Sequence, residues 1–253
     1  MLKQKEFFFG AYWKNDFSSA DTYITNAFRY INELSKIFDN STPYIVDNKF
    51  MLKNIPNKLD QFKLFLLPML YKNQAWYFNL NQNRVRNIEL DYTSDSGFYS
   101  QFIFDNDNTI SIKIRGGCHE ILSPEGYKYG NDIPNSILIE YSYDNSSIFE
   151  IDIIKQIFLI TVKIWNPFYC VLSPRDFLDL LYDNKNDFQI GWVNYINREL
   201  SFFTSPSYIK ERFESGTLII LSEKIPQSDN IQLLNNGKIL KQVLQDHCLL
   251  KWV

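Results

Sequence analysis

The sequence contains few of the residues on which many enzyme sites depend. Its 253 residues include only 2 histidines, 3 cysteines and 9 glycines. A small, odd number of cysteines without framework spacing excludes a disulfide scaffold and is typical of a reducing compartment. The shortage of glycine argues against a cofactor enzyme with phosphate-binding loops, because those loops need glycine for close backbone approach. We therefore expect a protein that binds no cofactor.

Clusters of basic residues and long apolar runs are also missing. The formal net charge is −3 and the sequence pI is about 5.5, and no run of Lys or Arg occurs, so nucleic-acid binding is not expected. No window approaches the roughly 18 apolar residues that a membrane-spanning helix needs. The N-terminal segment lacks the cleavage site of a signal peptide. These features predict a cytoplasmic protein that binds neither nucleic acid nor membrane.

Aromatic residues and hydrophobic periodicity are abundant, with 16 Tyr and 21 Phe. The strongest pattern lies in residues 148–165, where apolar residues recur at helical spacing in two adjacent stripes. Residues 145–147 offer N-caps for this helix, and Asn166-Pro167 stops it because proline cannot continue the turn. Apolar strands are predicted on either side. We expect this strand–helix–strand unit to be the buried centre of the fold.

The rest of the chain alternates between helical and period-two patterns. Strands are predicted at 7–13, 76–80, 98–104, 109–115, 137–143, 168–172, 190–196 and 216–221. Helices are predicted at 18–40, at 58–72 with a kink or early end at Pro68, from Ser173-Pro174, and at 231–246 with a break near 235–237. Connecting segments are predicted at 44–56, with a short strand as the alternative there, at 118–135, and at 201–213, with a short helix as the alternative there. Residues 105–108 read as the turn of a hairpin.

This element order predicts the α+β class, with mostly antiparallel sheet packed against several helices. Residues 1–253 are expected to form a single domain. An internal seam near residues 131–136 would then separate two intimately packed α/β halves.

No pattern of residues defines a catalytic or metal site. Cys118-His119 and His247-Cys248 contain metal-ligand types, but adjacent residues of an extended chain point to opposite faces. Cys170 lies in an apolar strand without a local histidine, which favours a packed thiol over a nucleophile. Gly116-Gly117 follows a strand but lacks the remaining parts of a phosphate-binding motif. A small hydrolase that uses Cys170 or His119 remains the alternative to a protein without enzymatic activity.

Acidic residues are frequent in the predicted turns, where Asp is a good turn former. They form either a solvated face or a surface for a basic partner. Tyr and Trp are preferred anchors of protein interfaces. The sequence therefore favours a protein that acts by binding another protein and not as an enzyme.

Four short motifs resemble the bacterial immunity protein 52 family. They are Phe9-Gly10-Ala11-Tyr12-Trp13, Trp165-Asn166-Pro167, Gly191-Trp192-Val193-Asn194-Tyr195 and Gly216-Thr217-Leu218-Ile219. They occur in the same order as in the family and span the chain. Asn166 stands where the family has Asp in its Trp-Asp-Pro step.

The resemblance implies a cytoplasmic antidote of a polymorphic-toxin or type VI secretion system. The partner would be a cognate toxin with a restriction-endonuclease-like DNase domain, whose active or DNA-binding surface the protein covers. The motif residues are interpreted as structural: Gly10, Tyr12, Trp13, Trp165, Pro167, Gly191, Trp192 and Gly216. Contacts with the toxin are predicted in loops, where partner specificity is expected. The candidates are Asp91, Asp95, Asp105, Asp107, Glu125, Tyr127 and Tyr129.

Overall fold

The computed structural model describes residues 6–13, 18–38, 41–47, 49–77, 90–91, 96–104, 110–118, 135–142, 150–181, 189–200 and 208–247. The strands in these ranges are β1 (Glu6–Trp13), β2 (Pro43–Val46), β3 (Leu52–Asn54), β4 (Ser96–Phe104), β5 (Ile110–Cys118), β6 (Asn135–Ser142), β7 (Tyr169–Pro174), β8 (Val193–Ile196), β9 (Ile209–Phe213) and β10 (Gly216–Ile220). The helices are α1 (Ala20–Ile37), α2 (Leu59–Tyr77), α3 (Ile151–Trp165), α4 (Arg175–Leu181) and α5 (Ile231–Asp246).

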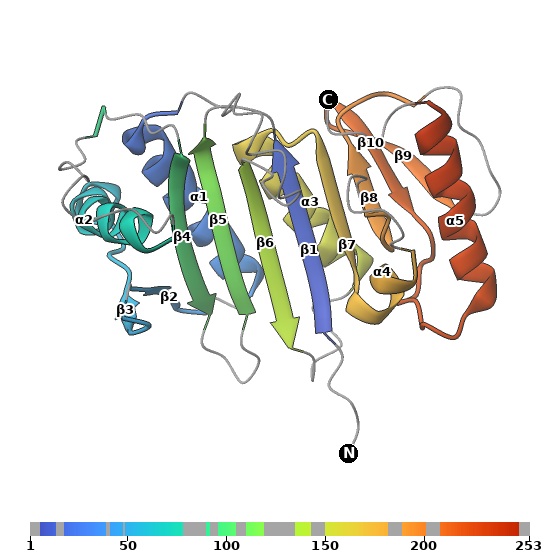
Figure 1. The fold of residues 1–253 in the computed structure, drawn as a ribbon, viewed down its shortest axis with the longest axis horizontal. Coiled ribbons are helices and arrows are strands. Elements are labelled where there is room, and N and C mark those ends of the chain that lie inside the picture. The colour runs from blue at the N-terminus through green and yellow to red at the C-terminus, as the bar shows by residue number, and fades with distance from the viewer. Residues whose placement is uncertain are drawn as a thin grey trace, which may run out of the picture.

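The described strands form one sheet in the order β3-β2-β4-β5-β6-β1-β7-β8-β10-β9. Every neighbouring pair in it is antiparallel. The predicted α+β class is therefore confirmed. The first strand of the chain lies in the middle of the sheet, where β1 pairs with β6 on one side and with β7 on the other (Figure 1).

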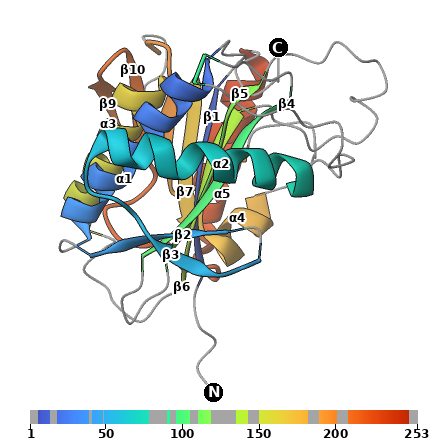
Figure 2. The ribbon, with the colours of Figure 1, turned by 90° about the vertical axis from the view of Figure 1, so that its left-hand side faces the viewer.

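Helices cover the two faces of the sheet unequally. α1 and α3 pack side by side on one face, and α4 lies on the opposite face (Figure 2). α2 crosses the β4 end of the molecule, and α5 packs on α4 at the β8–β10 end. The face of β4, β5 and β6 that points away from α1 is not covered by any described helix.

The core lies between the sheet and the pair α1 and α3. Alternation along β1 directs Phe7, Phe9 and Ala11 toward these helices, and all three are fully or almost fully buried. The Phe9 ring meets Phe158 of α3 edge to face, with ring centroids 5.1 Å apart. Full burial of a large apolar side chain stabilises by about 1.5–3 kcal/mol. The predicted central unit is thus β6–α3–β7, with β1 inserted between its two strands.

Ser19 caps α1 within the range where the helix was predicted to start, and its hydroxyl accepts from the Thr22 backbone N–H. The start of α3 is later than predicted: the helix begins at Ile151 after Glu150, and the proposed caps at 145–147 lie outside the described residues. Its end at Asn166 is as predicted.

Pro68 neither ends α2 nor shortens it, which corrects the expectation of an early end. Apolar residues on both sides of it, including Phe62 and Leu66 before and Leu70 after, are fully buried. Together they stabilise by more than the roughly 3 kcal/mol that an internal proline costs a helix. Ala75–Tyr77 consequently continue the helix, although their alternation predicted a strand.

α5 also continues through the predicted break, and at Gly237 it packs closely on α4. A Cβ atom at this position would lie 2.7 Å from Leu181 Cδ1. Gly237 therefore allows close contact between α5 and α4, and it does not interrupt the helix.

Two segments predicted as connections contain strands. Residues 43–54 form the β2–β3 hairpin at one edge of the sheet, and β9 forms the other edge. Residues 201–207 lie outside the described residues. The short strand allowed as the alternative in 44–56 is thus present as a hairpin, whereas β9 was not expected. Short edge strands have weak hydrophobic patterns, so periodicity gives little sign of them.

Candidate functional site

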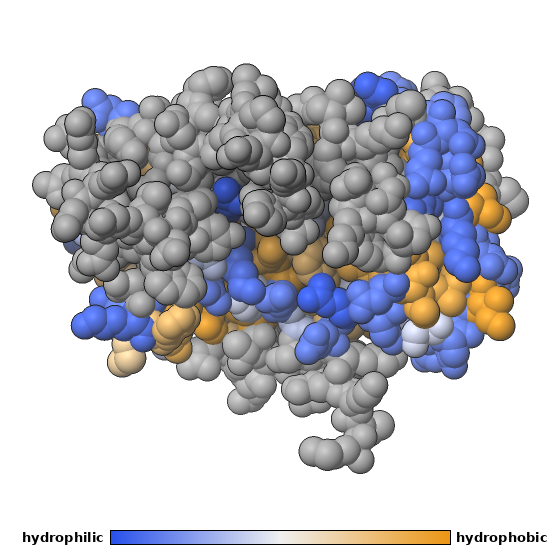
Figure 3. Space-filling view, in the orientation of Figure 1, coloured by the Kyte–Doolittle hydropathy of each residue, from blue (hydrophilic) through white to orange (hydrophobic). Residues whose placement is uncertain are grey.

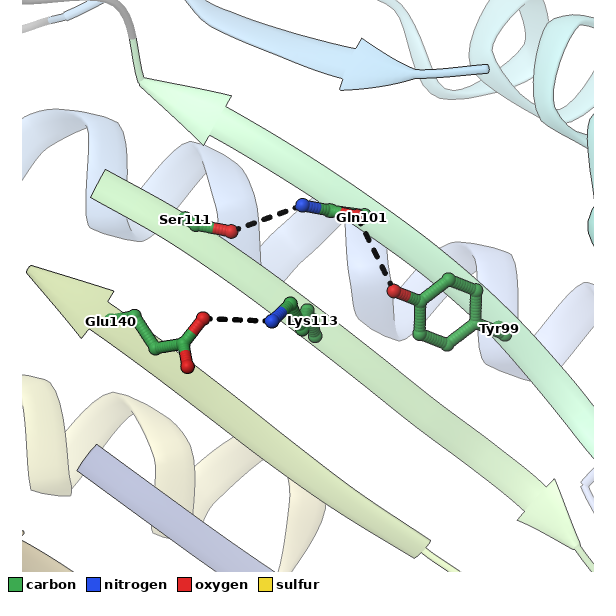
Figure 4. Close-up of polar contacts among 5 residues, drawn as sticks. All are labelled: Tyr99, Gln101, Ser111, Lys113 and Glu140. Atoms are coloured by element: carbon green, nitrogen blue, oxygen red, sulfur yellow. Dashed lines mark hydrogen bonds and ion pairs between the residues drawn. The ribbon is translucent and has the colours of Figure 1, made fainter. Parts of the chain in front are cut away.

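The face of β4, β5 and β6 that no described helix covers, here called the open face, carries a row of polar side chains. It is defined by Tyr99, Gln101, Ser111, Lys113 and Glu140, which Figure 4 shows on the side of the strands away from α1. Alternation explains the arrangement: Ile110, Ile112 and Ile114 face the core, so the residues between them face outward. All five defining side chains are half-buried.

These side chains hold one another in place. Lys113 Nζ lies 2.7 Å from Glu140 Oε2 on the neighbouring strand. The Gln101 amide donates to Ser111 Oγ at 3.2 Å, and its carbonyl oxygen accepts from the Tyr99 hydroxyl at 3.4 Å. Because cross-strand pairs of this kind contribute only about 0.2–1 kcal/mol each, they order the surface more than they stabilise the fold.

The open face continues toward β1 and becomes more apolar. Phe8 and Tyr12 point to this side of the sheet, and each is 8% exposed. The Arg175 guanidinium at the start of α4 lies over the Phe8 ring, 5.4 Å from its centroid. The Tyr12 ring stacks on Tyr169 with centroids 6.5 Å apart. Figure 3 shows apolar surface at the centre of this side, bordered by hydrophilic residues.

Of the residues predicted to contact the partner, only Asp91 lies within the described residues. It is exposed and follows Leu90, whose carbonyl accepts from the Asp21 N–H near the start of α1. Asp95, Asp105, Asp107, Glu125, Tyr127 and Tyr129 lie outside the described residues, so their contacts stay a prediction.

The β4–β5 register shows which residues lie at each end of this hairpin. Phe104 pairs with Ile110 at one end of the hairpin, and Ser96 pairs with Cys118 at the other. The two ends are about 26 Å apart at the usual rise per residue in a strand. Asp91 lies at the Ser96 end, where Ser18 approaches Gly117. Asp91 therefore lies far from the Phe104–Ile110 end of the hairpin.

The open face was not among the predicted contact residues, although the sequence contained its signal. Residues 110–115 alternate strictly, and the outward set Ser111, Lys113 and Arg115 is visible from that alternation. The partner residues on β4 and β6 depend on strand register, which no local pattern specifies.

The motif residues lie in the interior, namely Gly10, Tyr12, Trp13, Trp165, Pro167, Gly191, Trp192 and Gly216. Trp13 and Trp165 pack with ring centroids 5.1 Å apart, and Tyr30 meets Trp165 edge to face. The Trp192 indole donates to the Ser222 carbonyl at 2.7 Å. A Cβ at Gly191 would lie 2.5 Å from Val171 Cγ2, so this strand approach needs glycine.

Asn166 has a backbone role. It caps α3 in the left-handed conformation, with φ 46° and ψ 53°, and its N–H donates to the Val162 carbonyl. Asparagine is among the few residues that adopt this conformation readily. Its side-chain oxygen accepts from the Asn197 amide at 3.2 Å.

Cys170 has the properties of a core residue. Its side chain is fully buried, and burial raises the pKa of the thiol well above its ordinary value. A nucleophilic cysteine needs the opposite conditions, namely exposure and a lowered pKa. His119 and Cys248 lie outside the described residues. His247 is exposed at the end of α5, where its Nδ1 lies 2.8 Å from the Val243 carbonyl oxygen.

The described residues offer neither a metal-binding cluster nor a membrane span. They contain no group of three or more His, Cys, Asp or Glu residues placed to hold a metal ion. No helix among them combines the length and the apolar character needed to cross a membrane.

The fold is thus an α+β protein built on one antiparallel sheet, with a polar open face on β4–β6. No protein-family model matches the chain, and no curated protein matches it. Among solved structures it is similar to the "Pseudomonas aeruginosa T6SS protein PA0821", with 9% sequence identity and a TM-score of 0.48, over 93% of this chain and 72% of that chain. A likeness this distant carries no inference about function.

Proposed function

We propose that the protein is an immunity protein that binds a cognate bacterial toxin and neutralises it by covering a functional surface. The open face is the observation that carries this proposal. Its side chains are half-exposed and already fixed by contacts with one another, so binding would immobilise few additional rotamers. The sequence resemblance to immunity protein 52 supplies the class of partner.

The finer proposal is that the toxin is a DNase, as the resemblance implies. Such an enzyme presents a positive surface to DNA, and carboxylates such as Glu140 are suitable partners for it. Glu140 would then bind a basic group of the toxin with one carboxylate oxygen, while Lys113 holds the carboxylate in place.

Co-expression in a naive host tests the proposal. The toxin gene adjacent to the gene for this protein is induced with and without the wild-type protein, and survival is counted. We expect the protein to restore growth. If cells die equally fast with and without it, the proposal is wrong.

A matched pair of charge reversals tests the open face itself. Glu140→Lys breaks the ion pair with Lys113 on the open face. Glu211→Lys is the control, because it breaks a comparable ion pair elsewhere, in which Lys155 Nζ of α3 lies 2.9 Å from Glu211 Oε1. Both carboxylates are partly exposed, with side-chain exposures of 42% and 34%. We expect Glu140→Lys to reduce toxin affinity by about 10-fold or more and protection with it, because close charge pairs across an interface can couple by about 1.5 kcal/mol or more and the reversal replaces attraction by repulsion. Glu211→Lys should leave toxin affinity and protection within threefold of the wild type. Equal losses of affinity in the two variants would contradict the assignment of the open face as the toxin-binding surface.

A further inference from the structure

The open face is too small to form a whole interface by itself. Three strands at a spacing of about 4.8 Å and a rise of about 3.3 Å per residue cover roughly 400 Å². Each partner in a typical stable complex contributes about 800 Å². A toxin bound on this face must therefore also contact a neighbouring element.

The β2–β3 hairpin extends the sheet from β4 and presents an unusual surface. Its turn carries three consecutive large apolar residues that are exposed to solvent, Phe50 at 69%, Met51 at 61% and Leu52 at 47%. Figure 3 shows hydrophobic surface at the lower left, where Figure 1 places β2 and β3. Burial of such exposed side chains in an interface gives a large free-energy gain.

The turn is held in a defined shape. The Asp47 carboxylate accepts from the Met51 and Lys49 backbone N–H groups at 3.0 and 2.8 Å, and Lys53 Nζ lies 3.0 Å from its other oxygen. The Phe50 N–H donates to the Asp47 carbonyl. Phe50 itself has φ 61°, a conformation that large side chains rarely adopt. The fold therefore maintains a strained backbone that projects an aromatic ring into solvent.

The outer edge of β3 favours a protein over a lipid surface as the occupant. Asp47 N–H donates to the Met51 carbonyl, and Val46 pairs with Leu52 at the next position. Antiparallel alternation then directs the Leu52 backbone groups away from β2, and β3 is the last strand of the described sheet at this edge. A protein segment can pair with these groups, whereas lipid tails cannot.

We propose that the β2–β3 hairpin is an anchor for the toxin, with Phe50 and Met51 inserted into an apolar pocket of that protein. Lys49 is exposed beside them, so an acidic group at the rim of the pocket is the complementary charge. The proposal rests on the proposed function, because it names the second contact region of the same partner. It places the hydrophobic anchor on the hairpin and the polar contacts on the open face.

The test uses a double variant that preserves the turn. Phe50→Asn with Met51→Gln removes the apolar surface, and Asn accepts the left-handed conformation at position 50 better than Phe does. The control is Leu64→Gln, which removes an equally exposed apolar side chain, 76% exposed, from α2. The purified full-length chains are titrated with the purified protein encoded by the adjacent toxin gene, and thermal unfolding verifies that each variant is folded.

We expect the double variant to bind at least about 30-fold more weakly, the loss typical of an interface anchor. Leu64→Gln should stay within threefold of the wild type. If the double variant binds the toxin as tightly as the wild type does, the hairpin is not an anchor, but the proposed immunity function stands. Absence of wild-type binding would overturn both. If the double variant retains toxin binding but loses binding to phosphatidylglycerol vesicles, the hairpin contacts a membrane and the proposal is wrong.

Discussion

Asp47 shows how one side chain can determine the shape of a surface loop. Hydrogen bonds from the Met51 backbone and from Lys53 lower the pKa of Asp47 from its ordinary value of 3.8 to about 2. A carboxyl group whose pKa falls on folding stabilises the native state while it is ionised. Its contribution is therefore fully present above about pH 4 and is lost as the pH falls to about 2.

The substitution Asp47→Asn removes the charge but keeps an oxygen acceptor. We expect the variant to be less stable than the wild type at pH 7 and to approach wild-type stability as the pH falls from 4 to 2. Urea unfolding across this range measures the difference. A stability gap that stays constant from pH 7 to pH 2 would show that the carboxylate charge has no role in the turn.

At the scale of elements, the contact between α4 and α5 depends on the absence of a side chain at Gly237. In most helix interiors, replacing Gly with Ala stabilises by about 1 kcal/mol. Here the added methyl group would lie 2.7 Å from Leu181 Cδ1. Because Leu181 is itself buried, its side chain has little room to move aside, and overpacking of a core costs about 1–3 kcal/mol. The steric term is therefore expected to exceed the gain in helix propensity.

We thus predict that Gly237→Ala lowers the free energy of unfolding, whereas Asn235→Ala at an exposed position of the same helix does not. Chemical unfolding of both variants tests this. A double-mutant cycle with Leu181→Ala identifies the cause, because the cost of Gly237→Ala should shrink when the Leu181 side chain is removed. An unchanged cost in that background would point to the backbone of α5 instead.

At the scale of the whole molecule, the sheet depends on β1, which joins its two parts. β1 pairs along its length with β6 and with β7. Its inward side chains also contact α3. Neither β6 nor β7 has another described partner on the side that β1 occupies.

Removal of residues 1–13 should therefore abolish cooperative folding, whereas removal of residues 1–5 leaves β1 whole and should not. Near-ultraviolet circular dichroism and thermal unfolding of the two truncated chains distinguish these outcomes. A cooperative transition in the chain that lacks β1 would show that the two parts of the sheet fold independently.

Local sequence determined the elements with strong periodicity. Strand β1, helices α1 and α3 and the β4–β5 hairpin all follow from it, because burial on one face imposes a period of 2 or 3.6 residues on the chain. The stop at Asn166-Pro167 and the cap at Ser19 are equally local, since they depend on backbone conformation and one hydrogen bond. The same alternation predicts that Ser111, Lys113 and Arg115 of β5 face outward.

The tertiary structure decided everything that depends on a distant neighbour. The position of β1 between β6 and β7, and the register that sets Lys113 beside Glu140, result from pairing between segments far apart in the chain. The continuity of α2 through Pro68 and of α5 through Gly237 is set by packing that outweighs local preference. The exposed Phe50 and Met51 are visible only in the folded chain, because solvent exposure is a property of the whole molecule and not of a residue type.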